Sequence, residues 1–373
     1  MLPRIQELAT SLAPRLIEIR RHIHSHPELS GQEHQTAAYV AGVLASSGVR
    51  ATEGIGKTGV IGELKGNSNE SRWLAIRTDM DALPMQERTN LEFSSKNPGV
   101  MHACGHDIHT TVGLGAAMIL AQLEEKLPGH VRFLFQPAEE IAQGARWMIA
   151  DGAMKDVDGI LGLHVFPTIP GGSIGIRHGA LTAAADDLEL IVISQIITTL
   201  QQAISRTQNP LRPVVLTIGQ ISGGRAPNVI ADRVKLLGTV RSLHPETHEK
   251  LPAWIEQIVS SVCATYGAKY ELTYKRGVPG VQNDPKLTQL LEAAALEALG
   301  RSRVQILPEP SLGAEDFSMY LEHAPGTMFR LGVGLTDKPN YPLHHPQFEV
   351  DEAAIVTGAV TLAYAACQYW KQK

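Results

Sequence analysis

The sequence predicts an α/β protein with a mainly parallel sheet, interrupted by a smaller inserted domain of the α+β type. Apolar strand segments alternate with helical segments as far as residue 180, a pattern typical of a parallel sheet covered by helices. Polar residues follow directly after several of these strands, where α/β folds build their sites. The chain has 373 residues, too many for one small domain and enough for two.

The first part of the chain combines amphipathic helices with buried strands. Apolar residues recur every three or four positions over residues 5–24 and predict a helix that is kinked or restarted at Pro14. Further helices are expected over residues 36–47 and 110–123, the second with Asp107 as its cap. The predicted strands cover residues 60–64, 73–77, 131–135 and 160–165.

The pattern changes near residue 180, where a block rich in strands begins. Residues 182–281 are predicted to form the smaller domain, and residues 1–181 with 282–373 the discontinuous larger domain. The block's expected strands are 188–192, 214–218 and 234–241, and its helices 194–205 and 246–266. The larger domain resumes with helices over 285–299, 315–321 and 351–369 and a strand over 329–333. At 192–194 strand turns into helix without the Gly, Pro or Asn that such a turn usually needs.

Composition and charge exclude several classes of protein. Lys and Arg total 33 against 38 Asp and Glu, for a formal net charge of −5, which favours neither nucleic acid nor an anionic membrane as a partner. Three Cys in so long a chain predict free thiols and a cytoplasmic setting rather than a disulfide framework. No stretch approaches about 18 consecutive apolar residues, so we expect no membrane span.

The first candidate site residues are Cys104 and His106, which a single glycine separates. Gly105 leaves the backbone free to bend, so the two side chains can turn toward one point. Thiolate and imidazole suit Zn²⁺ and related divalent ions. The alternative is a buried thiol beside a surface histidine.

Two adjacent carboxylates, Glu139 and Glu140, follow the strand over residues 131–135. They can divide the work, because one can bind a metal ion while the other takes a proton from metal-bound water. Coordination lowers the pKa of water toward about 7, which makes a carboxylate base competent at neutral pH. The alternative for two adjacent acids is a solvated loop.

Histidines complete the candidate set. His164 lies in an apolar strand, where an ordinary core histidine is the alternative. His344 and His345 precede the C-terminal helix, where the alternative is a polar turn. Together with Cys104 and the two glutamates, these residues stand at successive element boundaries of one domain. Their nitrogen, oxygen and sulfur donors exceed what one tetrahedral ion needs, which favours a two-metal site.

These segments resemble the M20 metallopeptidase family, in particular its amidohydrolase branch of N-acyl-amino-acid amidohydrolases, hippurate hydrolases and auxin-conjugate hydrolases. The resemblance follows the family's order over almost the whole chain. Its most specific motifs are Cys-Gly-His-Asp at 104–107 and Gln-Pro-Ala-Glu-Glu at 136–140. The others lie at residues 21–24, 27–30, 77–84, 162–164, 223–230, 238–241, 314–317 and 343–344.

The resemblance implies a binuclear metal centre. Its ligands would be Cys104, His106, Glu140, His164 and His344. Glu139 would be the general base that activates the metal-bound water and then protonates the leaving amine. The two divalent ions per subunit would be Zn²⁺, although Mn²⁺, Co²⁺ or Ni²⁺ also suit these donors.

Two acids would support the ligands. Asp81 matches a residue that orients a ligand by hydrogen bonding in related proteins. Asp79 stands where other branches of the family carry a metal-binding histidine. Strand-end capping is the alternative role for both acids.

The inserted domain resembles the family's dimerisation or lid domain, so a homodimer is expected. Asn228 and Arg241 match polar positions that help to hold a substrate carboxylate in relatives, and Arg suits that planar group. A turn-forming Asn and a surface Arg are the alternatives. Relatives carry about twenty further residues near 192–194, including an oxyanion-stabilising histidine, and losing such a donor can cost about 10²–10³ in rate.

The predicted function is metal-dependent hydrolysis of small N-acyl amino acids to a carboxylate and a free amino acid. One rival is a dipeptidase or carboxypeptidase of the same family. Another is a catalytically impaired metal-binding dimer scaffold, if the segment near 192–194 is truly deleted. A nucleotide-binding enzyme is disfavoured, because no G-x-G-x-x-G or Walker-type loop follows a strand and residues 54–59 lack the required spacing.

Overall fold

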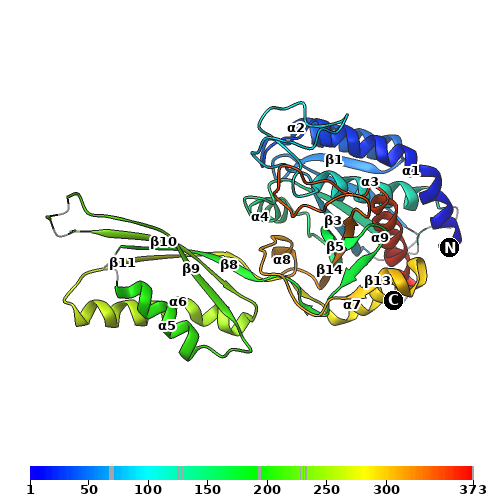
Figure 1. The fold of residues 1–373 in the computed structure, drawn as a ribbon. Coiled ribbons are helices and arrows are strands. Elements are labelled where there is room, and N and C mark those ends of the chain that lie inside the picture. The colour runs from blue at the N-terminus through cyan, green and yellow to red at the C-terminus, as the bar shows by residue number, and fades with distance from the viewer. Residues whose placement is uncertain are drawn as a thin grey trace. The chain divides into compact units, whose positions relative to one another are not determined.

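The computed structural model describes residues 1–66, 71–123, 127, 129–191, 195–226, 228–229, 231 and 233–371. The chain forms two compact units (Figure 1). Unit 1 comprises Met1–Gly179, Asn283–Pro308 and Met319–Lys373, and unit 2 comprises Ala180–Gln282 and Glu309–Ser318. Two short strands, β7 (Gly179–Ala180) and β12 (Gln282–Asn283), lie where the chain passes between the units. The sequence-based division placed residues 309–318 with the larger domain, whereas their contacts are with unit 2.

Unit 1 is built on an eight-stranded sheet. Its order is β1 (Arg50–Ile55), β2 (Gly59–Leu64), β4 (His130–Gln136), β3 (Trp73–Asp79), β5 (Val157–Pro170), β14 (Gly326–Gly334), β6 (Ile174–Ile176) and β13 (Val304–Ile306). The central strands β4, β3, β5 and β14 are parallel. All residues of β3 and β14 are buried, as expected for parallel strands covered on both faces. The predicted α/β class with a mainly parallel sheet is confirmed.

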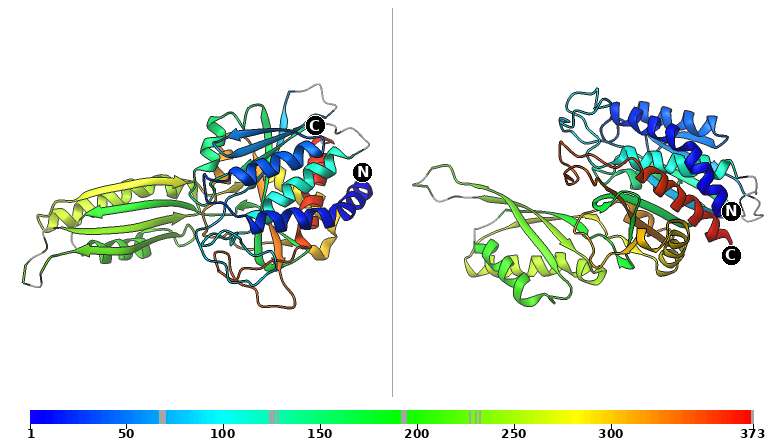
Figure 2. Two further views of the ribbon diagram at one scale, coloured as in Figure 1. Left: turned by 90° about the horizontal axis from the view of Figure 1, so that it is seen from above. Right: turned by 45° about the vertical axis from the view of Figure 1, so that its right-hand side comes forward.

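The helices of unit 1 pack on this sheet and on one another. They are α1 (Leu2–Ser25), α2 (His34–Ser46), α3 (His106–Ala121), α4 (Gly144–Ala150), α7 (Pro285–Leu299), α9 (Ala354–Lys371) and the 3₁₀ helix Arg301–Arg303, while α8 (Phe317–Tyr320) lies at the unit boundary. The α1 helix continues through Pro14 without a restart. It contacts both α3 and α9, and its start lies close to the end of α9 (Figure 2).

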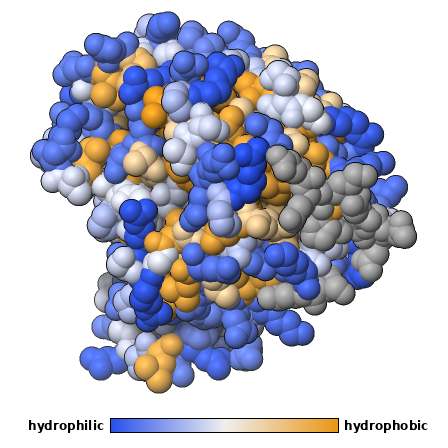
Figure 3. Space-filling model, turned by 90° about the vertical axis from the view of Figure 1, so that its right-hand side faces the viewer, coloured by the Kyte–Doolittle hydropathy of each residue, from blue (hydrophilic) through white to orange (hydrophobic). Residues whose placement is uncertain are grey.

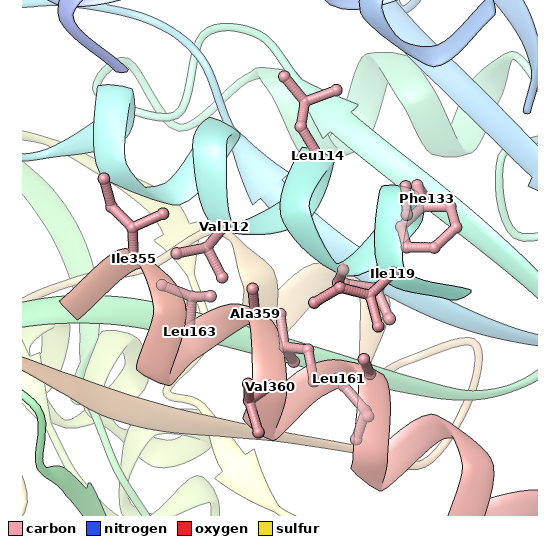
Figure 4. Close-up of a cluster of buried hydrophobic side chains, with 14 of the residues drawn as sticks. Val112, Leu114, Ile119, Phe133, Leu161, Leu163, Ile355, Ala359 and Val360 are labelled. Atoms are coloured by element: carbon pink, nitrogen blue, oxygen red, sulfur yellow. The ribbon is translucent and has the colours of Figure 1, made fainter. Parts of the chain in front are cut away.

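The contact between α3 and α9 forms the centre of the unit 1 core (Figure 4). Small residues allow the close approach, because a Cβ on Gly115 would lie 3.0 Å from the Cβ of Ala359. A Cβ on Gly358 would lie 2.8 Å from Val112. Leu161 and Leu163 of β5 pack against this pair of helices from the sheet (Figure 4). The packing fixes α3 against α9, and the first residue of α3 is the candidate metal ligand His106.

Unit 2 is an antiparallel four-stranded sheet with two helices and its own core. The strand order is β11 (Glu271–Val278), β8 (Ala184–Ile191), β10 (Val234–Ser242) and β9 (Val214–Gly223), with helices α5 (Gln195–Thr207) and α6 (Pro245–Thr265). Buried residues alternate along β8, which is typical of a sheet with one covered face. The residues 192–194 that join β8 to α5 lie outside the described part of the chain.

Each helix in the described part of the chain is too short or too polar to span a lipid bilayer. On the face drawn in Figure 3, hydrophilic side chains predominate and hydrophobic ones form several groups among them.

Candidate metal centre

The candidate residues of unit 1 gather where neighbouring strands and helices end. Asp79 is the last residue of β3, and the glutamate pair follows the end of β4. Because β3 and β4 are parallel and paired in register, these ends meet at one edge of the sheet. The adjacent strand β5 carries His164 within the same parallel set. The topology therefore brings donors from distant parts of the sequence to one place.

Gly105 explains how Cys104 and His106 share this place. It has φ +81°, the left-handed region that favours glycine. A Cβ there would also lie 2.5 Å from Cγ2 of Val165. The turn at Gly105 begins α3, so Cys104 precedes the helix and His106 opens it. Both strain and crowding thus require glycine at this position.

The histidines and the thiol form a close group. Cys104 Sγ lies 3.5 Å from Nε2 of His164 and 3.3 Å from Nε2 of His344. His344 has φ +63°, and its N–H donates to the Ala103 carbonyl at 2.8 Å, which fixes its loop beside the thiol. Cys104, His106 and His164 are buried, whereas His344 is exposed.

The two glutamates face the same group. Glu140 Oε1 lies 3.8 Å from Nε2 of His106 and 3.6 Å from Nε2 of His344. Glu139 Oε2 lies 3.9 Å from Nε2 of His106. Four overlapping triads in unit 1 have donor atoms within 4.8 Å of one another: Cys104–His106–His164, Cys104–Glu140–His344, His106–Glu139–Glu140 and Asp79–His106–His109.

Two of these donor atoms are buried without a hydrogen bond. His106 Nε2 and Glu140 Oε1 have no hydrogen-bond partner among the described residues. Leaving a buried polar atom unpaired costs about 1–3 kcal/mol, so native structures rarely do so. A divalent cation would satisfy both atoms. The donor set therefore fits the two-metal centre that the sequence predicts.

Burial and charge set the protonation of the donors. Burial and the nearby Glu140 carboxylate raise the pKa of the Cys104 thiol well above its usual value. Burial alone would lower the pKa of His106, but the Asp79 carboxylate and the Cys104 sulfur raise it well above its usual value. Metal ligands must be deprotonated, so a cation binding here would displace both protons.

Asp81 contacts a candidate ligand directly. Its Oδ1 lies 3.2 Å from Nδ1 of His106, which leaves Nε2 of that ring for the centre of the cluster. Its Oδ2 accepts hydrogen bonds from the Ser30 hydroxyl at 2.6 Å and from the Glu140 N–H at 3.0 Å. The same carboxylate thus contacts a donor ring and the loop that carries both glutamates.

Asp79 pairs with a histidine that the sequence interpretation did not select. His109 Nε2 accepts the N–H of Val165 at 2.9 Å, so its proton lies on Nδ1 and is donated to Asp79 Oδ1 at 2.5 Å. Asp79 Oδ2 also accepts from Nη1 of Arg77 at 2.8 Å. His109 follows His106 by three residues, and this spacing places the two on one face of a helix. That spacing was the feature of the sequence that could have placed His109 beside the candidate ligand His106.

Asp107 does not cap α3, contrary to the sequence prediction. The helix begins at His106, with Gly105 at its cap position, so Asp107 lies in the first turn. Its buried carboxylate instead accepts from Nε of Arg20 at 2.8 Å and lies 2.8 Å from Nδ1 of His24. The prediction was wrong because these partners lie on α1, distant in sequence.

The other residues considered from the sequence are Asn228, Arg241 and His345. Asn228 and Arg241 belong to unit 2. Asn228 is exposed, and Nη1 of Arg241 donates to the Leu312 carbonyl at 2.7 Å. The ring of His345 stacks on that of Tyr341, with centroids 4.4 Å apart.

The sequence pattern of Peptidase family M20/M25/M40 matches residues 75–368. The chain belongs to the M20 peptidase family. This confirms the predicted family and the prediction that the chain is an amide hydrolase.

Named relatives cover nearly the whole chain. A probable hydrolase of Synechocystis sp. (strain ATCC 27184 / PCC 6803 / Kazusa) is 67% identical over 98% of this chain and 98% of the relative. An N-acetyl-L-cysteine deacetylase of Bacillus subtilis is 38% identical over 96% of this chain and 88% of the relative. Thermostable carboxypeptidase 1 of Saccharolobus solfataricus is also 38% identical, over 95% of each chain.

A solved structure also resembles this chain. A Bacillus subtilis protein described as a dinuclear metal-binding peptidase of the M20 family has a TM-score of 0.87 and 38% identity, over 98% of this chain and 99% of that chain. The description of that neighbour agrees with the several donor triads that unit 1 brings together.

Proposed function

We propose that this M20 hydrolase cleaves the amide bond of N-acyl amino acids, with Glu139 as the general base. The observation that carries the proposal is the pair of unpaired buried atoms, His106 Nε2 and Glu140 Oε1, beside the Glu139 carboxylate. The B. subtilis relative named for N-acetyl-L-cysteine deacetylation supports the substrate class. The products would be a carboxylate and a free amino acid.

The proposed division of roles follows from the donor chemistry. Two divalent ions would be held by the five donors Cys104, His106, Glu140, His164 and His344. When bound, they would polarise the acyl carbonyl and lower the pKa of water. Glu139 takes the proton from the attacking water and returns it to the leaving amine nitrogen, as general acid–base catalysis requires. Asp81 orients His106 by accepting at its Nδ1.

Adjacent substitutions test the two glutamate roles. Glu139→Gln should lower kcat by about 10²–10⁴, the usual contribution of a general base, while the metal content stays unchanged. The matched control Glu140→Gln makes the same chemical change one residue away and should reduce metal content. Metal per subunit and kcat would be measured on the same preparations. Retention of activity by Glu139→Gln would overturn the assignment.

A carboxypeptidase or dipeptidase is the second candidate, because a relative with the carboxypeptidase name is as similar as the deacetylase. Both activities require a metal centre and a base, so the site chemistry does not separate them. Rates of hydrolysis of N-acetyl-L-cysteine, benzoylglycine and unblocked dipeptides distinguish the two activities. Preference for the acetyl or benzoyl conjugates supports the proposal, whereas faster cleavage of dipeptides supports the alternative.

A catalytically impaired scaffold has one specific observation in its favour. The alignment with the Synechocystis relative spans 387 positions, more than the 373 residues of this chain, so this chain lacks counterparts for some residues of that relative. Bound metal without turnover on the whole panel would favour the scaffold. Turnover would exclude it.

The family resemblance also supports a homodimer formed through unit 2, with Asn228 and Arg241 holding the substrate carboxylate. Light scattering would measure the dimer mass. An Arg241→Lys change removes the planar fork that matches a carboxylate and should raise KM while kcat is kept.

A further inference from the structure

The loop that carries Glu139 is a hydrogen-bonded turn that begins with a residue in an uncommon backbone conformation. Ala138, the residue before Glu139, has φ +52°, a left-handed conformation that side chains other than glycine rarely adopt. Its carbonyl accepts the N–H groups of Gln143 at 3.2 Å and Gly144 at 3.1 Å. A Cβ on Gly144 would lie 1.6 Å from the Pro137 carbonyl oxygen. The direction in which the Glu139 side chain points therefore depends on the left-handed backbone conformation of Ala138. Contacts from neighbouring residues must stabilise that conformation.

Two buried carboxylates hold this loop on either side of Glu139. The N–H of Ala138 donates to Oε1 of Glu33 at 2.9 Å. The N–H of Glu140 donates to Oδ2 of Asp81 at 3.0 Å. Glu33 is 0% exposed and Asp81 1% exposed. Burial raises the pKa of the Glu33 carboxyl, but a carboxyl oxygen can accept hydrogen bonds in either protonation state.

The Glu33 side chain makes its hydrogen bonds to these loops and not to the helix that follows it. It stands directly before α2, yet its side chain makes no capping hydrogen bond to that helix. Its Oε1 also accepts the Gly31 N–H at 2.8 Å, and its Oε2 accepts the Thr58 hydroxyl at 2.5 Å. Thr58 belongs to the glycine-rich 54–59 turn that matched no phosphate loop. The fully buried Glu33 side chain therefore joins the loop of Gly31 and the turn of Thr58 to the loop that carries Glu139.

We propose that Glu33 is a positioning residue for the general base: by accepting the Ala138 N–H, it holds the left-handed turn that directs Glu139 toward the donor cluster. The inference rests on the proposed role of Glu139. It assigns Glu33 no contact with substrate or metal.

Three substitutions at Glu33 distinguish the position of its acceptor oxygen from the chemical type of the group that carries it. Glu33→Gln keeps an oxygen at the same reach and should keep kcat within about threefold. Glu33→Ala removes the acceptor and should lower kcat by roughly 10- to 100-fold, the scale of a misplaced catalytic group, with KM and metal content little changed. Glu33→Asp keeps the charge but is one methylene shorter, so it should resemble Glu33→Ala; it also serves if the alanine variant does not fold.

Glu28→Ala is the matched control. Glu28 accepts the Thr36 N–H and the Thr36 hydroxyl, both at 2.9 Å, so it supports the start of the same helix without contacting the Glu139 loop. This variant should lower Tm but leave kcat at the wild-type value. Amide hydrogen exchange gives a readout independent of activity: peptides spanning 138–144 should exchange faster in Glu33→Ala and Glu33→Asp, and not in Glu28→Ala.

The outcomes separate this inference from the proposed function. Wild-type kcat and unchanged exchange in both Glu33→Ala and Glu33→Asp would overturn the positioning role, even if Glu139→Gln is inactive. A loss in Glu33→Gln equal to that in Glu33→Ala would also overturn it, because reach would then not matter. If Glu139→Gln stays active while Glu33→Ala loosens the 138–144 loop, the base assignment fails and Glu33 holds the loop for another purpose.

Discussion

At the scale of single residues, buried carboxylates surround the candidate metal centre and contact its histidines and loops. Asp81 contacts the ring of His106, and Asp79 accepts from His109. Asp107 lies in a third pair, with Arg20 and His24. Burying a charge is costly unless it is paired and hydrogen-bonded. The hydrogen bonds that stabilise each buried carboxylate therefore also fix the orientation of the neighbouring histidine ring or loop.

The His24 network extends to Glu87 and predicts a dependence of stability on pH. Burial alone would raise the pKa of Glu87, but hydrogen bonds from His24, Thr89 and the Ser95 N–H lower it to about 2. An acid with a lowered pKa in the folded state stabilises it above the unfolded value of 4.5. That stabilisation is lost as the pH falls from about 4.5 toward about 2.

Replacing Glu87 should remove this acid-sensitive contribution. Glu87→Gln should lower the free energy of unfolding at pH 7 by less than about 3.5 kcal/mol, the unscreened limit at about 1.4 kcal/mol per pKa unit. The difference from wild type should shrink as the pH falls from 4.5 toward 2, in urea unfolding measured across that range. Glu92→Gln, at an exposed position, is the control. A difference that stays constant with pH would contradict the mechanism.

At the scale of elements, the turn into α3 depends on a glycine. Gly105→Ala should destabilise the fold by more than the roughly 1–2 kcal/mol of left-handed strain, because the new Cβ meets Val165 as well. It should also weaken metal binding, because Cys104 and His106 flank the turn. Gly48→Ala provides the control: its φ is +77°, but nothing lies within 4 Å of the new Cβ.

Calorimetry and metal titration test this prediction. Gly48→Ala should cost only the roughly 1–2 kcal/mol of backbone strain and leave metal affinity unchanged. Equal stability losses in the two variants, with unchanged metal affinity in both, would show that crowding by Val165 has no consequence.

At the scale of the whole molecule, the two units have separate hydrophobic cores. The core of unit 1 includes the α3–α9 contact, and that of unit 2 is centred on residues such as Leu236 and Ile255. The candidate metal donors all belong to unit 1. A loss of packing in unit 2 should therefore spare the candidate metal centre.

Leu236→Ala tests this separation. Leu236 is 0% exposed, and truncating such a leucine typically costs about 2–5 kcal/mol. Hydrogen exchange should accelerate in peptides of unit 2, while metal content and the protection of α3 and α9 stay at wild-type values. Leu211→Ala, at a position 83% exposed, is the control. Metal loss in Leu236→Ala would contradict independent cores.

Periodicity, motif order and donor chemistry together predicted much of this protein from sequence. The alternation of strands and helices predicted the α/β class, because hydrophobic period reports which face is buried. The donor types from Cys104 to His344 favoured a two-metal site, and the resemblance to the M20 family predicted a metal-dependent hydrolase. The dimer and the substrate contacts of Asn228 and Arg241 stay predictions.

Only the tertiary structure decided which acid meets which partner. It pairs Glu33 with the N–H of Ala138, 105 positions away, and Asp107 with α1 in place of a helix cap. Periodicity reports burial along one element, whereas these contacts depend on how loops from separate elements meet at a sheet edge. The sequence by itself determined the fold class and the chemical types of the donors. Tertiary packing determined where each donor side chain points, because its hydrogen-bond partner is whichever group lies near it in the folded chain and not in the sequence.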